Sequence, residues 1–141
     1  MYKGWDELKP QVMELEAHLN TIGVDLKPCH NDAVPENFIK SPEGKLYLID
    51  WEYSGMNDPM ADLAALFIES DFSEESKDFL LARYFEGNIP TMAREKILCY
   101  QVLWDCLWSQ WTVIKEAKGD DFGSYGIDRF ERARRNLKLI K

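Results

Sequence analysis

The chain has 141 residues, about the length of one domain, and 45% of them are hydrophobic. Five Trp, six Tyr and seven Phe favour a globular protein over a disordered one, and a formal net charge of −8 argues against a nucleic-acid binder, which needs a basic face. No apolar run approaches the length of a membrane span, so no membrane contact is expected. The three cysteines lack metal-binding spacing and fit the reduced thiols of a cytoplasmic protein.

The first half of the chain predicts one helix and one hairpin. Apolar residues step by three and four over residues 8–22, which indicates an amphipathic helix that ends at Gly23. Residues 26–37 are too short and irregular for a helix. Residues 38–40 and 45–50 flank a Pro-Gly turn and predict a β-hairpin.

The second half of the chain predicts helices only. One should begin at Pro59 after an Asn or Asp N-cap, and another should be capped by Ser73 and end before Gly87. A long helix is expected over about 90–118, and a final one from Ile127 to the end. The order predicts a mainly α fold with a small β-hairpin.

A loop rich in polar residues carries the chemistry. His30, Asp32 and Asn37 form an H-x-D-x-x-x-x-N pattern, and Asp50 follows the apolar run at the exit of the predicted hairpin. Phosphoryl transfer needs one carboxylate that accepts a hydroxyl proton and oxygen ligands that hold Mg²⁺ against the phosphates. Because the hairpin returns Asp50 towards the loop, the pattern predicts a phosphoryl-transfer site.

This spacing matches the protein-kinase catalytic loop in outline. The segments HND…PENF and LYLIDWEYSGMNDPMADLA resemble the choline-kinase and aminoglycoside-phosphotransferase superfamily, especially the bacterial choline kinases that supply phosphocholine for surface polysaccharides. The resemblance implies that residues 1–141 form the carboxy-terminal lobe of a protein-kinase-like fold, with the catalytic loop and the choline site. It also implies choline and ATP as substrates and Mg²⁺ as cofactor.

The same resemblance assigns roles to the polar residues. Asp32 is expected to be the catalytic base, and Asn37 and Asp50 are expected to bind Mg²⁺ and so the nucleotide. His30 is expected to brace the loop rather than to react. Glu52 either reaches the metal or holds the loop, and the sequence leaves both open.

A stripe of aromatic residues lies on one face of the long predicted helix. Such stripes are usually core, which is the expectation for Tyr100 and Trp104. The segment LWSQWTVIKEAKGDDFGSYGIDRF resembles the carboxy-terminal part of choline kinases, where a Trp pair and a Tyr wall the choline pocket. The resemblance therefore implies a box of Trp108, Trp111 and Tyr125.

The remaining charged residues carry weaker signals of function. Glu69 is a candidate anion for the choline site by the same resemblance. Asp105 is a second candidate for that anion, although a solvated charge is the stronger expectation. The cluster of basic residues on the last helix is expected to be a solvated face that complements the helix C-terminus.

No Gly-rich phosphate loop and no strand-borne lysine precede Asp32. We therefore expect a fragment or a naturally short protein that lacks the amino-terminal ATP lobe, is inactive alone and forms a homo-oligomer through the surface that this lobe would cover. An ethanolamine or aminoglycoside kinase is one alternative, although a primary ammonium favours carboxylates over an aromatic box. A non-catalytic choline-binding remnant is another.

Overall fold

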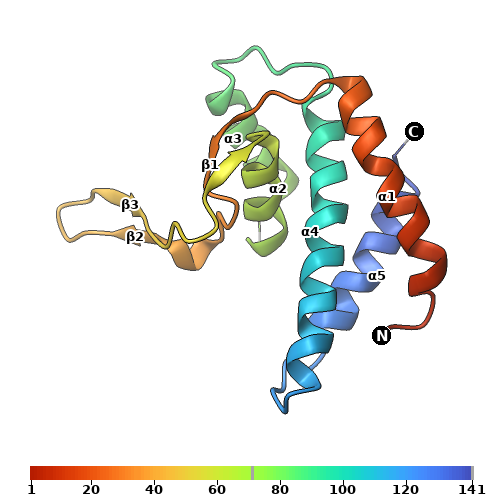
Figure 1. Cartoon of the computed structure of the whole chain (residues 1–141). Helices are drawn as coiled ribbons and strands as arrows, with labels where there is room; N and C mark the ends of the chain where they lie inside the picture. The colour runs from red at the N-terminus through yellow and green to blue at the C-terminus, as the bar shows by residue number, and fades with distance from the viewer. Residues whose placement is uncertain (71, 141) are drawn as a thin grey trace. The chain divides into compact units, whose positions relative to one another are not determined.

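The computed structural model describes residues 1–70 and 72–140. The chain divides into two compact units, one made of residues 1–23 and 98–141 and the other of residues 24–97 (Figure 1). The described residues are mostly helical, with two small antiparallel sheets, which confirms the predicted mainly α fold. No helix among them is both long and apolar enough to cross a membrane.

The first unit is helical. It contains α1 (Trp5–Ile22), most of α4 (Ala93–Glu116) and α5 (Tyr125–Leu137), and Figure 1 shows α1 and α5 beside α4. The predicted apolar stripe of α1 is buried, and the rings of Tyr2 and Trp5 lie 5.3 and 6.4 Å from the ring of Phe130 on α5. Aromatic packing therefore joins the start of the chain to its last helix.

The start of α5 packs closely against α4. A Cβ added to Gly126 would lie 2.8 Å from the Cβ of Thr112 and would also meet the Tyr2 hydroxyl. Only a residue without a side chain fits there without displacing its neighbours. α5 begins at Tyr125, two residues before the predicted start, and the Tyr125 N–H donates to the Phe122 carbonyl.

A buried ion cluster joins α4 and α5, and it corrects two expectations. Asp105, predicted to be a solvated charge, is fully buried, and so is Arg129 from the basic cluster of the last helix. Arg129 donates to Asp105 Oδ1 at 3.0 Å, and Arg132 donates to both carboxylate oxygens at 2.7 Å. The charges that looked like surface residues in the sequence are partners across the helix interface.

The second unit holds both sheets. The hairpin of β2 (Phe38–Lys40) and β3 (Leu46–Leu48) confirms the predicted one. A second antiparallel ladder, between β1 (Lys27–Cys29) and β4 (Gly55–Asn57), was not predicted. It brackets the polar loop and the hairpin, so the two ends of the candidate site are tied together.

Of two further helices in this unit, the one after Ser73 begins as predicted, and the one after Asp58 begins one residue later than predicted. α2 (Met60–Glu69) starts after Asp58, whose Oδ1 accepts a hydrogen bond from the Met60 N–H. Asp58 is buried and also pairs with Lys96 Nζ at 2.5 Å. α3 (Glu74–Tyr84) starts after Ser73, whose hydroxyl accepts from the Ser76 N–H. Capping residues therefore located both helix starts.

All three cysteines are free thiols and are buried. Burial raises the pKa of the Cys29 thiol to about 11, and Cys29 Sγ donates to the Asn57 carbonyl. Burial raises the pKa of the Cys106 thiol to about 12. Such thiols stay protonated at neutral pH and behave as small core residues.

Candidate active site

The polar loop brings Asp32 and Asn37 together. A single 3₁₀ turn, Pro35–Asn37, folds the chain back so that Asn37 Nδ2 donates to the Asp32 carbonyl at 2.9 Å and to Asp32 Oδ2 at 3.2 Å. Asn37 is buried. Because its amide nitrogen is held by Asp32, its Oδ1 is the atom that can face a cation.

His30 connects this loop to the exit of the hairpin. Its ring is buried, and Nε2 lies 2.7 Å from the Ile49 carbonyl oxygen, which can only accept a hydrogen bond. Nε2 therefore carries the proton, and Nδ1 accepts from the Asp32 N–H at 3.2 Å. The rings of Trp51 and His30 pack at a steep angle of 66°, with their centroids 4.8 Å apart. These are the contacts of a residue that holds the loop, and both ring nitrogens are engaged by the backbone.

Asp50 follows Ile49 with a left-handed backbone, at φ 63°. A non-glycine residue in this region is strained, and such strain gathers at functional sites. The Asp50 side chain is exposed, whereas Asp32 is half-buried. Burial raises the pKa of the Asp32 carboxyl, the Asn37 hydrogen bond lowers it, and the charge of Asp50 raises it again. The carboxylates of Asp32 and Asp50 are therefore close enough to interact electrostatically.

These residues fit a magnesium ion by their chemistry. Mg²⁺ prefers hard oxygen ligands and is usually held by one or two carboxylates together with water and substrate phosphates. The exposed carboxylate of Asp50 and the amide oxygen of Asn37 supply such ligands beside Asp32. Among residues 1–70 and 72–140, no group of three or more His, Cys, Asp or Glu side chains could hold a metal ion by itself.

The sequence analysis missed a carboxylate that holds the loop. Asp62, in the first turn of α2, accepts from the backbone N–H of His30 at 2.8 Å and of Asn31 at 2.7 Å. Asn31 has a positive φ of 64° and its side chain bridges Tyr53 and Asn57. An acidic residue in a first turn is expected for helix stability alone, so its second role had no signal in the sequence.

Glu52 is exposed. The nearby Glu52 carboxylate raises the pKa of the Tyr53 hydroxyl. The Glu52 carboxylate therefore lies near the Tyr53 hydroxyl, on the segment that follows Asp50. Whether it reaches a metal or holds the loop stays a prediction with two alternatives.

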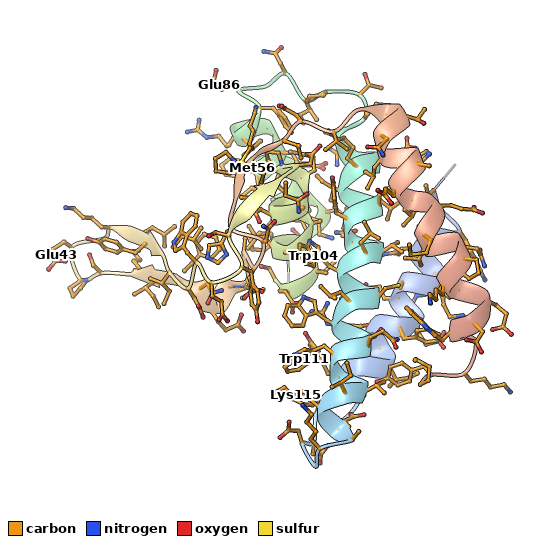
Figure 2. The ribbon with its side chains drawn as sticks, viewed as in Figure 1. Glu43, Met56, Glu86, Trp104, Trp111 and Lys115 are labelled. Atoms are coloured by element: carbon orange, nitrogen blue, oxygen red, sulfur yellow. The ribbon has the colours of Figure 1, made fainter. Side chains whose placement is uncertain are left out.

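The aromatic residues of α4 form a cluster with one ring that was not predicted. The rings of Trp108 and Trp111 lie 5.6 Å apart at 79°, and Phe122 packs on Trp111 at 5.1 Å. Figure 2 shows Trp104 and Trp111 on the same side of α4, with Lys115 one turn further along. Lys115 Nζ lies 5.2 Å from the centre of the Trp111 ring, so the cluster already accepts a cation.

The other predicted members of the choline box lie on different elements. Tyr125 is 38% exposed at the start of α5, and the Arg129 guanidinium lies 4.5 Å from its ring centre. Glu69 is half-buried at the end of α2, in the other unit from the aromatic residues. Its role as the anion of the choline site stays a prediction. Tyr100 is buried as predicted, whereas Trp104 is half-buried.

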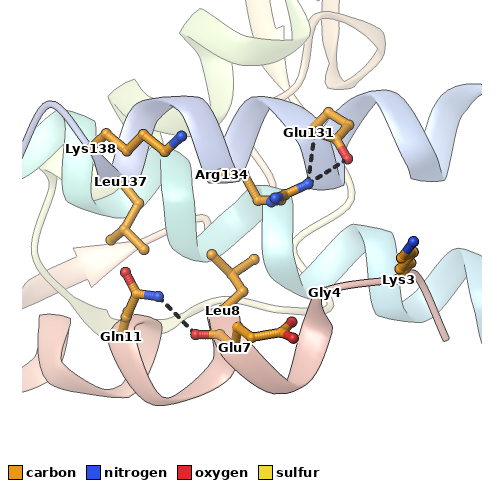
Figure 3. Close-up of a pocket in the computed structure, with 9 residues that line it drawn as sticks. All are labelled: Lys3, Gly4, Glu7, Leu8, Gln11, Glu131, Arg134, Leu137 and Lys138. Carbon is orange, nitrogen blue, oxygen red and sulfur yellow. Dashed lines mark hydrogen bonds and ion pairs between the residues drawn. The ribbon is translucent and has the colours of Figure 1, made fainter.

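A pocket of about 570 Å³ lies between the start of α1 and the end of α5 (Figure 3). Charged side chains of both signs line it, and Arg134 and Glu131 pair with each other at 3.1 Å. None of the predicted site residues lines this pocket. It therefore has no part in the candidate site.

The helices, the hairpin and the loop have the architecture of the carboxy-terminal lobe of a protein-kinase-like fold. A family model described as choline/ethanolamine kinase matches residues 3–99. The protein LicA of Haemophilus influenzae (strain Rd) is 38% identical over 124 residues, which are 84% of this chain and 45% of the relative. The chain belongs to the choline/ethanolamine kinase family.

Solved structures agree with this assignment. The crystal structure of choline kinase LicA from Streptococcus pneumoniae matches with a TM-score of 0.89 and 51% identity, over 98% of this chain and 49% of that one. A structure of LicA in complex with AMP matches with a TM-score of 0.89 and 48% identity, over 99% of this chain and 48% of that one. The chain spans about half the length of the relatives that it matches.

Proposed function

We propose that the chain supplies the catalytic loop, the metal ligands and the choline site for ATP- and Mg²⁺-dependent phosphorylation of choline. The observation that carries the proposal is the bonding around Asp32. Asn37 binds its carboxylate, His30 binds its backbone N–H, and the same His30 ring binds the residue before Asp50. These hydrogen bonds connect the proposed proton acceptor to one proposed metal ligand and to the residue before the other.

In this mechanism the choline hydroxyl oxygen attacks the γ-phosphorus of ATP, and the Asp32 carboxylate accepts the hydroxyl proton. The bond between the γ-phosphorus and the bridging oxygen breaks, and ADP leaves. The half-buried position of Asp32 raises its pKa and so makes it a better proton acceptor than an ordinary aspartate. Asn37 and Asp50 would hold Mg²⁺, which neutralises the charge of the phosphates. His30, with both ring nitrogens bonded to the backbone, keeps the loop in place.

The hairpin offers a surface for the base of the nucleotide. Ile39 pairs with Tyr47 across the hairpin, so the two share one face, and Ile49 follows directly after the end of β3. All three are exposed, and Ile49 directly precedes Asp50. An exposed apolar face beside a carboxylate that would hold Mg²⁺ fits a purine, and a structure of LicA has been solved in complex with AMP.

The aromatic cluster favours choline over a primary amine. A quaternary ammonium has no proton to donate and is recognised through the faces of aromatic rings. Trp108 and Trp111 are half-buried rather than fully packed, and Trp111 already carries a lysine ammonium over its ring. Ethanolamine, which would favour several carboxylates, is the second acceptor to test because the family model covers both.

The direct test is transfer of radiolabelled phosphate from ATP to choline, with ethanolamine and an aminoglycoside as competing acceptors. Because these 141 residues contain no Gly-rich phosphate loop, we expect transfer only when the remaining half of the pneumococcal relative is supplied. Choline binding with no transfer in the reconstituted enzyme would instead identify a non-catalytic choline-binding module.

The choline site can be tested on the chain itself through tryptophan fluorescence. Trp108→Ala and Trp111→Ala should each weaken choline binding by about 0.5–2 kcal/mol, because each removes a ring face from the cation. Trp104→Ala is the control from the same helix and should mainly lower thermal stability. Equal losses of choline affinity in all three variants would contradict the assignment of Trp108 and Trp111.

The exposed face of the hairpin should also make the chain self-associate. Tyr47 and Trp51 are about half exposed, at 49% and 52%, and Ile39 and Ile49 lie beside Tyr47, while Val34 is half-buried. Identical chains at high concentration cover such a face, usually in a two-fold dimer. Light scattering over a dilution series should show a dimer that dissociates, and Tyr47→Lys should shift it to monomer. A chain that is monomeric at every concentration contradicts this expectation.

A further inference from the structure

Tyr125 and Arg129 lie one helical turn apart at the start of α5. Helical side chains point back towards the N-terminus, so a residue at i+4 reaches the one at i. The Arg129 guanidinium uses this geometry to lie over the Tyr125 ring, 4.5 Å from its centre. Tyr125 is 38% exposed, whereas Arg129 is buried at 3%. A surface ring is thus placed on a buried, planar support.

The support is itself fixed by α4. Arg129 Nη1 donates to Asp105 Oδ1 at 3.0 Å, and Asp105 is fully buried and also bound by Arg132 through two hydrogen bonds of 2.7 Å. Asp105 lies one turn before Ser109 on the helix that carries Trp108 and Trp111. The same helix therefore carries the Trp pair and the carboxylate that anchors the support of Tyr125.

We infer that Arg129, anchored by Asp105, is a positioning residue that holds the Tyr125 ring ready to receive the quaternary ammonium of choline. The inference rests on the proposed function, because it takes Tyr125 as a wall of the choline site. A ring that is ordered before the ligand arrives loses less conformational entropy on binding. Asp105 offsets the positive charge of Arg129, so the supporting cation repels the ligand less than a bare guanidinium would.

The test compares the same change, Arg to Lys, at the two arginines that bind the Asp105 carboxylate. Arg129→Lys keeps a cation for Asp105 but removes the planar group that stacks on Tyr125, whereas Arg132→Lys makes the same change on the partner that does not stack there. In titrations followed by tryptophan fluorescence, Arg129→Lys should weaken choline binding by about two- to tenfold, the range expected for freeing one side chain. Arg132→Lys should leave the Kd nearly unchanged. Equal effects of the two changes would overturn the inference.

A double-mutant cycle with Tyr125→Leu separates positioning from a general loss of structure. If Arg129 acts through the ring, Arg129→Lys should have no further effect on choline affinity once Tyr125 is Leu, whereas additive losses would overturn the inference. If Arg129→Lys does not fold, the unaltered chain can be followed by NMR instead. The Arg129 Nε–H signal would be assigned as the one that moves in Tyr125→Leu. In the unaltered chain, this signal should shift on saturation with choline. An unmoved signal would overturn it too.

These outcomes also separate this inference from the proposed function. A chain whose unaltered form binds no choline refutes the choline site itself, and the positioning role with it. Choline binding that is weakened by Tyr125→Leu but not by Arg129→Lys refutes only the positioning role of Arg129.

Discussion

Replacing Asp32 by Asn should lower the turnover of choline phosphorylation by about 10²–10⁴-fold, the contribution typical of a positioned general base. The change removes the proton acceptor but keeps the size of the side chain. Nucleotide affinity should change little, because Asp32 is assigned no phosphate contact. Turnover and the KM for ATP would be measured separately in the enzyme reconstituted with the remaining half of the pneumococcal relative.

Glu36→Gln is the matched control for this substitution. Glu36 is exposed in the same loop, and its charge also raises the pKa of Asp32. Removing that charge should leave most of the turnover in place, since Glu36 is not assigned a proton-transfer role. Near-normal turnover in Asp32→Asn, or an equal loss in Glu36→Gln, would contradict the assignment of the base.

The hairpin and the helix starts could be predicted because their signals are local. A turn with Pro42 and Gly44 separates two apolar runs, and the pairing of Phe38 with Leu48 follows from that turn. Ser73 and Asp58 each bond a backbone N–H two or three residues later, which is a short-range rule of capping. Within such distances, residue type alone determined the structure.

The ladder of β1 and β4 could not be predicted in the same way. Lys27 pairs with Asn57 across the whole polar loop and hairpin, and each strand is only three residues long. Pro28 and Gly55 lie within these strands and weaken the local signal for a strand. The pairing depends on the loop and hairpin between them, so it appears only in the folded unit.

The candidate site shows the same difference between features with a local sequence signal and features that depend on the fold. The motif offered candidates for the chemistry, because phosphoryl transfer restricts residue type and spacing, and their roles stay a prediction. It did not reveal Asp62, whose two backbone hydrogen bonds hold the loop, or Phe122, which completes the ring cluster on Trp111. Residues that support a site are chosen by shape and hydrogen bonding in three dimensions, so a single sequence shows them only as ordinary helix or loop residues.

Asp105 is the strongest case of a residue whose role depends on distant partners. Its partner Arg129 lies 24 residues later, on another helix, and nothing around Asp105 distinguishes it from a solvated charge. Burial lowers the pKa of Arg129 to about 10, with a further lowering by the charge of Arg132. The fold therefore already disfavours the charge on Arg129, and the carboxylate of Asp105 opposes this effect.

Asp105→Ala should accordingly destabilise the chain by about 3–5 kcal/mol, the cost typical of removing one partner from a buried ion pair. Two guanidiniums would then lie close together without their shared carboxylate. Urea denaturation followed by circular dichroism would measure the loss as a lower midpoint. Because whole domains are stable by only about 5–15 kcal/mol, this loss would remove a large share of the free energy of unfolding.

Glu131→Ala provides the comparison from the same unit. Glu131 pairs with Arg134 at 3.1 Å, but both side chains are nearly half exposed, at 43% and 45%. Water screens such a pair, so its removal should cost no more than about 1 kcal/mol. The contrast between the two variants measures what burial adds to an ion pair in this chain. If Asp105→Ala and Glu131→Ala unfold at the same urea concentration, the buried cluster does not hold α4 and α5 together, and the rigid support inferred for Tyr125 loses its anchor.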